Sequence, residues 1–100
     1  MAKHKIYISG KITGMEDEAK YVFQAAEEKI KKEFPDSKII NPMKLDHSNH
    51  DKKWESYMKV CIMELLKCDM IVMLPNWQDP KGASMELDIA TQLNFYTEFL

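Results

Sequence analysis

The feature that constrains this chain most is a short apolar run, MIVML at 70–74, placed directly after a long helical pattern. Consecutive apolar residues without alternation are typical of a strand that is covered on both faces of a sheet. The preceding segment, KWESYMKVCIMELLKC (53–68), has its apolar residues at helical spacing and forms one continuous stripe. A helix followed by a doubly covered strand indicates a parallel sheet of the α/β class.

The same alternation of strand and helix extends along the rest of the chain. Residue patterns predict strands at 4–9, 37–40 and 69–74, and helices at 16–34, 53–68 and 83–93. The segment FYTEF (95–99) is predicted to be a last strand, with continuation of the preceding helix as the alternative. This order predicts one domain, residues 1–100, with a parallel sheet of four to five strands and helices on both faces.

Charge and cysteine content exclude several classes of protein. The net charge is −2, and the local basic clusters alternate with acids, so they are interpreted as solvated helix faces rather than a nucleic-acid surface. No apolar run is long enough to span a bilayer, and no signal peptide opens the chain. Cys61 and Cys68 lie seven positions apart on one predicted helix, too far for a disulfide, which favours buried thiols in a reducing cytoplasm. We therefore expect neither a nucleic-acid polymer nor a membrane as partner.

Three loops are predicted to meet beyond the carboxyl ends of the strands, where open parallel sheets bind ligands. They are Gly10–Met15, Asn41 onward and Pro75–Gly82. Two of them lead into helix N-termini, which favour anions, and they carry Lys11 and Lys81. The segment GKITG matches neither the dinucleotide nor the P-loop fingerprint, so a simple turn at Gly10 is the alternative.

Glu86 is the sharpest candidate for chemistry. It lies on the core-facing side of the last predicted helix, with Ala83 three residues before it and Ala90 four after it. We expect it in the first turn of that helix, where the helix dipole would help to keep it ionised. An ionised carboxylate in a partly apolar pocket suits attack on the acetal carbon of a sugar. The alternative is a glutamate that only complements the dipole.

The other candidate site residues have weaker support from the sequence. The segment DHSNHD (46–51) pairs two histidines in a loop without the regular spacing of a zinc motif, and we expect no metal site and no cofactor. Ser84 lacks the G-x-S-x-G turn of a hydrolase nucleophile. Trp77, in the third loop, is a candidate to stack on a base or cover the pocket, with a hydrophobic plug as the alternative. Ser9, the last residue of the first predicted strand, and Lys11, in the loop after it, are candidate substrate contacts together with Lys81.

Five segments together resemble a known family. KIYISGKITG, the dipeptide NP, W..YM, L..CDMIVMLPNW and KGASMELDIA are similar to segments of small bacterial and phage proteins related to nucleoside 2-deoxyribosyltransferases. The likeness is greatest to the short DUF4406 branch, and the wider group includes 2′-deoxynucleoside 5′-phosphate N-hydrolases. It runs from about Lys5 to Leu93. It implies a three-layer, flavodoxin-like (Rossmann-like) fold and cleavage of the N-glycosidic bond of a deoxynucleoside or its monophosphate.

The resemblance also implies roles for individual residues. Glu86 matches the nucleophilic glutamate, and Tyr7 matches a tyrosine placed near it. Gly10, Ile12 and Gly82 match positions that contact the substrate. Cys61 departs from the family, because an aspartate that handles the proton of the leaving base usually occupies that position.

Two hypotheses about function follow: a deoxyribosyl transferase or deoxynucleotide hydrolase, and a nucleotide-binding module that has lost catalysis. Tyr7, Glu86 and Gly82 favour the enzyme, whereas Cys61 favours the binding module.

Trp54, Tyr57 and the many methionines offer more apolar surface than a small sheet needs, and relatives pair, so we expect a homodimer or a higher homo-oligomer. The transferases complete their sites with residues near the C-terminus of a neighbouring subunit. No such segment follows the last predicted strand here, which leaves the oligomer geometry and the base specificity open.

Overall fold

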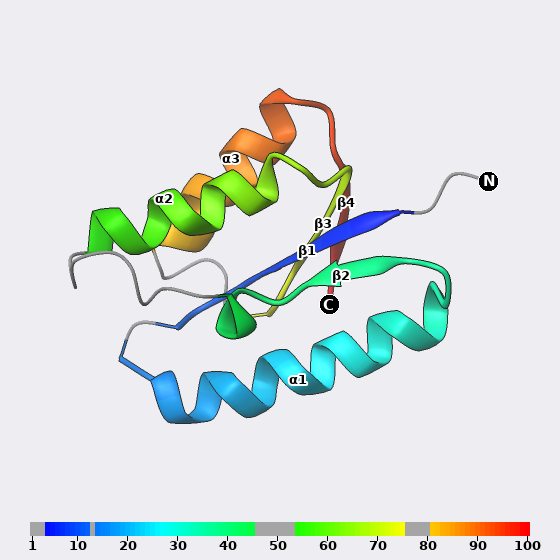
Figure 1. Ribbon diagram of the computed structural model, residues 1–100, viewed down its shortest axis with the longest axis horizontal. Helices are drawn as coiled ribbons and strands as arrows, with labels where there is room; N and C mark the ends of the chain where they lie inside the picture. The colour runs from blue at the N-terminus through cyan, green and yellow to red at the C-terminus, as the bar shows by residue number, and fades with distance from the viewer. Residues whose placement is uncertain (1–3, 13, 46–53, 76–80) are drawn as a thin grey trace.

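A parallel sheet of four strands forms the centre of the computed structural model, which describes residues 4–12, 14–45, 54–75 and 81–100 (Figure 1). The strand order is β2-β1-β3-β4, which is the flavodoxin-like order. The elements are, in chain order, β1 (Lys5–Ser9), α1 (Glu16–Glu33), β2 (Lys38–Ile40), the short 3-10 helix η1 (Pro42–Lys44), α2 (Trp54–Leu65), β3 (Met70–Met73), α3 (Lys81–Gln92) and β4 (Tyr96–Phe99). The predicted α/β class, parallel sheet and element order are confirmed.

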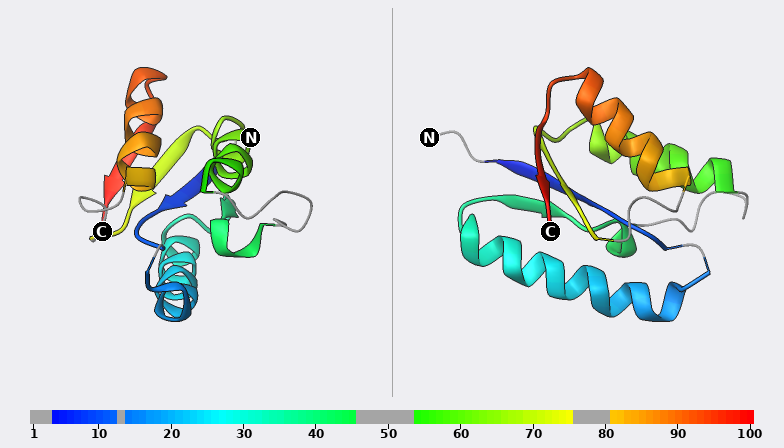
Figure 2. Two further views of the ribbon diagram at one scale, coloured as in Figure 1. Left: turned by 90° about the vertical axis from the view of Figure 1, so that its left-hand side faces the viewer. Right: turned by 180° about the vertical axis from the view of Figure 1, so that it is seen from behind.

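Helices cover both faces of the sheet, as the uninterrupted apolar run of β3 predicts. In Figure 2, α1 lies on one side of the sheet and α2 and α3 lie on the other. Alternate residues of β1 and β3 serve the two faces, because successive side chains of a strand point in opposite directions. Ile6 and Ile8 pack with Phe23 on the α1 side, while Tyr7 and Ile71 pack on the side of α2 and α3. Two separate apolar layers therefore hold the sheet.

Two apolar side chains at helical spacing, Val22 and Leu66, are more exposed than that spacing predicts. Val22 in α1 is 37% exposed, although Ala19, Phe23 and Ala26 of the same pattern are buried. Leu66, predicted at the end of the α2 stripe, is 54% exposed, and α2 ends one residue before it. The chain tightens there, since Lys67 and Cys68 donate their N–H groups to carbonyls three residues earlier instead of four.

The last helix ends in a Schellman motif, which decides between the two predictions for the C-terminal segment. The N–H of Phe95 donates to the carbonyl of Ala90 at 2.9 Å, and that of Asn94 donates to the carbonyl of Thr91 at 3.1 Å. Asn94 takes a φ of 61°, a left-handed conformation that asparagine tolerates better than most residues. The chain then turns back as β4, parallel to β3, so the prediction of a last strand is correct.

Gly10, directly after β1, packs tightly against the side chain of Leu74, which follows β3. A Cβ atom at this position would lie 2.7 Å from Leu74 Cδ1 and 2.8 Å from Leu74 Cβ. Glycine is therefore required for packing after β1, and not only for a turn. None of the helices in the described part of the chain is both long and apolar enough to cross a bilayer.

Candidate active site

A pocket of about 480 Å³ opens beyond the carboxyl ends of β1 and β3, on the side of the sheet covered by α2 and α3. This is the edge at which flavodoxin-like sheets bind ligands. Its walls come from the loop after β1, from η1, and from the amino-terminal turns of α2 and α3. The described residues that line it are Tyr7, Gly10, Lys11, Ile12, Pro42, Trp54, Tyr57, Met58, Cys61, Lys81, Gly82, Ala83 and Glu86.

Glu86 points from α3 toward the sheet at the inner end of this pocket. Its side chain is 5% exposed, and each carboxylate oxygen accepts a hydrogen bond from a buried hydroxyl of β1. Tyr7 donates to Oε2 at 2.7 Å, and Ser9 donates to Oε1 at 2.6 Å. Tyr7 and Ser9 are two residues apart on one strand, so both side chains face the same helix. The carboxylate is thus fixed from one side by two hydroxyl donors.

The ionisation of Glu86 differs from the expectation. Burial raises the pKa of its carboxyl from 4.5 to about 7, although the hydrogen bonds from Ser9 and Tyr7 act in the opposite direction. The residue also lies in the second turn of α3 rather than the first, because the helix begins at Lys81 and not at Ala83. Desolvation therefore outweighs the two hydrogen bonds, and the carboxyl changes charge near neutral pH.

The neighbours of Glu86 remain protonated over the same range. Burial, followed by the proximity of Glu86, raises the pKa of Tyr7 well above its ordinary value of 10.0. Burial and then Glu86 raise the pKa of Cys61 from 9.0 to about 12, although the hydroxyls of Tyr7 and Tyr57 act in the opposite direction. Tyr57, one helical turn before Cys61, has its pKa raised mainly by burial. Glu86 is therefore the one group of this cluster that titrates near neutral pH.

The outer part of the pocket is aromatic and basic. Trp54 begins α2, and the ammonium of Lys81 lies 4.6 Å from the centroid of its ring. Gly82 lets α2 and α3 approach here, since a Cβ atom at this position would lie 3.1 Å from Met58 Sδ. A flat ring and a cation thus stand at the mouth, while hydroxyls and a carboxyl stand at the inner end.

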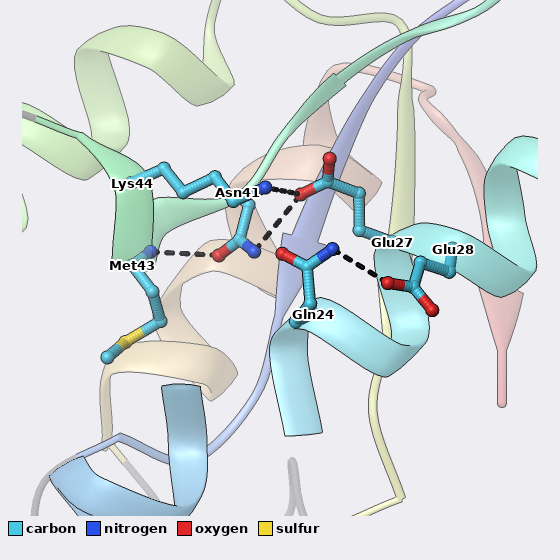
Figure 3. Close-up of polar contacts among 6 residues, drawn as sticks. All are labelled: Gln24, Glu27, Glu28, Asn41, Met43 and Lys44. Carbon is cyan, nitrogen blue, oxygen red and sulfur yellow. Dashed lines mark hydrogen bonds and ion pairs between the residues drawn. The ribbon is translucent and has the colours of Figure 1, made fainter. Parts of the chain in front are cut away.

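A polar cluster on the other side of the sheet fixes the wall formed by η1. Asn41 caps η1 by accepting a hydrogen bond from the backbone N–H of Met43 at 2.9 Å. Figure 3 shows Asn41 and Lys44 converging on the same oxygen of Glu27 in α1, at 3.2 and 3.0 Å. These bonds tie α1 to η1 and hold Pro42 in the pocket wall.

The structure brings most of the predicted site residues together. Tyr7, Gly10, Lys11, Ile12, Lys81, Gly82 and Glu86 all line the pocket. Ser9 differs, because it is fully buried behind Glu86 and does not line the pocket. Tyr7 is the central residue of β1. Trp77 lies outside the described residues, as do His47 and His50.

Sequence reasoning missed Trp54, Tyr57, Met58 and Pro42 as pocket residues. The sequence pattern places Trp54 and Tyr57 in the apolar stripe of α2 and among the apolar side chains available for a dimer interface. One signal was available, because both residues lie in the amino-terminal half of the helix that precedes β3. In a parallel α/β fold that half of the helix lies at the edge where ligands bind. Among the described residues, no group of three or more histidine, cysteine or acidic side chains is placed to hold a metal ion.

Comparison with known proteins identifies the family. The model of the family described as a domain of unknown function (DUF4406) matches residues 4–97, and the chain belongs to this family. No curated protein matches the chain. The family assignment therefore carries no activity with it.

A solved structure is similar to the fold. The 2-desoxiribosyltransferase from Leishmania mexicana superposes with a TM-score of 0.70 at 18% sequence identity. The match covers 97% of this chain and 63% of that protein, so the chain spans less than two thirds of its length. The fold is thus that of a deoxyribosyltransferase-like, Rossmann-like α/β protein.

Proposed function

We propose that this protein cleaves or transfers at the N-glycosidic bond of a 2′-deoxynucleoside or its 5′-monophosphate, with Glu86 as the nucleophile. The observation that carries the proposal is the buried Glu86 carboxyl, held by Tyr7 and Ser9 in a pocket at the carboxyl edge of the sheet. A core helix would be more stable with an apolar residue there, since burying a carboxyl is costly. The likeness of the fold to a 2-desoxiribosyltransferase supports the same chemistry.

The proposed reaction has two displacements at the anomeric carbon. An oxygen of ionised Glu86 attacks C1′, and the C1′–N bond breaks with its electron pair going to the base nitrogen, which takes up a proton. The resulting glycosyl ester is then attacked at C1′ by water or by a nitrogen of a second base, which loses a proton and releases the carboxylate. A 2-deoxy sugar suits this path, because it lacks the electron-withdrawing hydroxyl beside C1′.

The two ends of the pocket suit the two ends of such a substrate. The sugar would lie at the inner end beside Glu86 and Tyr7. The ring of Trp54 would stack on the base, a contact worth about 1–3 kcal/mol where bases stack on aromatic side chains. Lys11 and Lys81 line the same pocket and would favour a 5′-phosphate. Ile12 and the backbone of Gly10 and Gly82 would complete the walls.

The described part of the pocket offers no second carboxyl group that could donate a proton to the leaving base. Among the described lining residues Glu86 is the only carboxyl, and it must be ionised to attack. The Cys61 thiol, with a pKa of about 12, is a poor acid and a poor base at neutral pH. Solvent would then protonate the base, which predicts slow turnover, because a placed acid is commonly worth about 10²–10⁴ in rate.

The decisive experiment measures free base after incubation with deoxynucleosides and deoxynucleoside 5′-monophosphates. We expect release by the wild type and at least a roughly 10³-fold lower rate for Glu86→Gln, because loss of a nucleophile removes the covalent path. Asp88→Asn is the matched control, since Asp88 is an exposed acid two residues further along α3. Equal rates for Glu86→Gln and the wild type would exclude Glu86 as the nucleophile.

A second function is favoured by Cys61. A nucleotide-binding module would keep the pocket without the proton-handling group, as this chain does at position 61. Such a protein would be stabilised against thermal unfolding by a deoxynucleotide and release no base from it. That pair of results would replace the enzyme with the binding module.

The assembly and the cellular compartment belong to the same proposal. We expect a homodimer, since β4 forms an edge of the sheet with exposed apolar side chains. The two cysteines are buried and free, as suits a reducing cytoplasm.

A further inference from the structure

We propose that Ser9 is a positioning residue for this reaction: it holds one oxygen of Glu86 from behind the pocket and leaves the other, beside Tyr7, to attack the sugar. The inference rests on the proposed function and deepens it. It also changes the role expected for Ser9 from the sequence, which was a direct contact with substrate.

The geometry separates the two oxygens of the carboxyl. Oε1 receives the hydroxyl of Ser9 at 2.6 Å, and Ser9 is fully buried and does not line the pocket. Oε2 receives the hydroxyl of Tyr7 at 2.7 Å, and Tyr7 does line the pocket. The reacting oxygen must face the substrate, so Oε2 is the one placed to attack. Oε1 serves as the fixed end of the carboxyl.

The two hydroxyl donors also favour the charged form of Glu86. The two donor–acceptor distances, 2.6 and 2.7 Å, lie within the range of hydrogen bonds from a hydroxyl to an ionised carboxylate. A protonated Glu86 has an O–H of its own and needs an acceptor, so one of the two hydroxyls would have to turn round. Ser9 and Tyr7 can donate together only to the carboxylate. Removing either donor should therefore make the carboxylate harder to form.

The hydrogen bonds that stabilise the Glu86 carboxylate come from two residues of β1, Tyr7 and Ser9. From α2, Cys61 and Tyr57 face it as neutral groups with raised pKa values. Among the lining residues that the structure describes, Lys11 and Lys81 are the cations. Ser9 contributes no charge of its own, so its effect on Glu86 is that of a hydrogen bond alone.

A direct titration of Glu86 tests the proposal without relying on activity. In protein labelled with ¹³C at the glutamate side-chain carboxyl, the Glu86 signal is the one that disappears in Glu86→Gln. We expect Ser9→Ala to raise the pH midpoint of this signal by about one unit, as loss of a hydrogen bond to a charged group would. Tyr7→Phe should raise it as well.

The control is a second buried serine. Ser37 is 5% exposed and donates to the carbonyl of Phe34 at 2.7 Å, on the opposite side of β1 from the site. Ser37→Ala therefore removes a buried hydroxyl of the same kind and should leave the Glu86 titration unchanged. Ser9→Thr keeps the hydroxyl and should restore the wild-type midpoint.

The kinetic result follows from the same shift. For Ser9→Ala, kcat at pH 7 should fall about fivefold with KM little changed, because a rise of one unit from a midpoint of about 7 lowers the ionised fraction of Glu86 about fivefold there. The rising limb of the pH profile should move by the same amount as the titration. An unchanged Glu86 midpoint in a folded Ser9→Ala would overturn the proposal. A shifted midpoint in a series where even the wild type releases no base would instead overturn the proposed function and leave the hold of Ser9 on Glu86 intact.

Discussion

At the residue scale, Glu86 combines two opposing effects in one side chain. Burial favours its neutral form, and the hydroxyls of Tyr7 and Ser9 favour its charged form. The balance leaves a carboxyl that is partly ionised at neutral pH, so the charged form that the proposed attack requires becomes the main form only above about pH 7. The same balance has a consequence for folding, because the unfolded chain ionises Glu86 at a lower pH.

The first prediction therefore concerns stability against pH. The pKa of Glu86 is about 7 in the folded protein and 4.5 in the absence of its surroundings. Between these values the unfolded state has lost the proton that the folded state keeps, so the stability from this group falls as pH rises from 4.5 to about 7. At 1.36 kcal/mol per unit, the loss above pH 7 is about 3 kcal/mol.

Urea unfolding at a series of pH values measures this effect. The free energy of unfolding of Glu86→Gln, minus that of the wild type, should grow with pH across this window and then level off. Asp88→Asn, which removes an exposed acid of the same helix, is the matched control. A flat difference for Glu86→Gln would mean that the Glu86 carboxyl is not destabilised by burial.

At the scale of elements, the tight packing of Gly10 against Leu74 gives a second prediction. Gly10→Ala places a Cβ atom 2.7 Å from Leu74 Cδ1 and 2.8 Å from its Cβ, so Leu74 or the end of β1 must shift. We expect a loss of about 2 kcal/mol in stability, as for overpacking in a core. Activity should fall too, because Ser9 is the preceding residue and moves with the strand.

A second glycine provides the comparison. Gly82→Ala meets Met58 Sδ at 3.1 Å, and a flexible thioether gives way more easily than a strand end. Thermal unfolding of both variants should show the smaller loss for Gly82→Ala. A larger loss at Gly82 would show that the contact between α2 and α3 is the tighter one.

The sequence patterns predicted the helices and strands well, but they predicted the ends of these elements less well. The apolar run of β3 and the stripes of α1 and α2 predicted a parallel sheet with helices on both faces. The ends of elements depend on caps, so Asn94 decided the end of α3 where apolar spacing left two choices. Glu86 was found because a carboxyl on a core-facing position is unusual. Ser9 was misplaced, because the direction of a side chain behind the pocket depends on packing across 77 positions of the chain.

At the scale of the whole molecule, exposed apolar side chains gather near one edge of the sheet. Leu93, Tyr96, Phe99 and Leu100 are between 36% and 58% exposed, and Tyr96 and Phe99 belong to β4. We predict that the protein sediments as a homodimer and that Phe99→Lys weakens the association. Tyr21→Lys is the control, since Tyr21 is 72% exposed on α1. A wild type that sediments as a monomer at assay concentrations would contradict this prediction.

The hydrogen bond between Tyr7 and Glu86 spans 79 positions, nearly the full length of the sequence. A nascent chain that has left the ribosome as far as β3 holds the two hydroxyls and the thiol, but not the acid that they surround. Under the proposed mechanism such a chain is inert, however well its first strands have paired. The proposed chemistry can begin only when translation has delivered α3, so the proposed active site is completed later than the first three strands of the sheet.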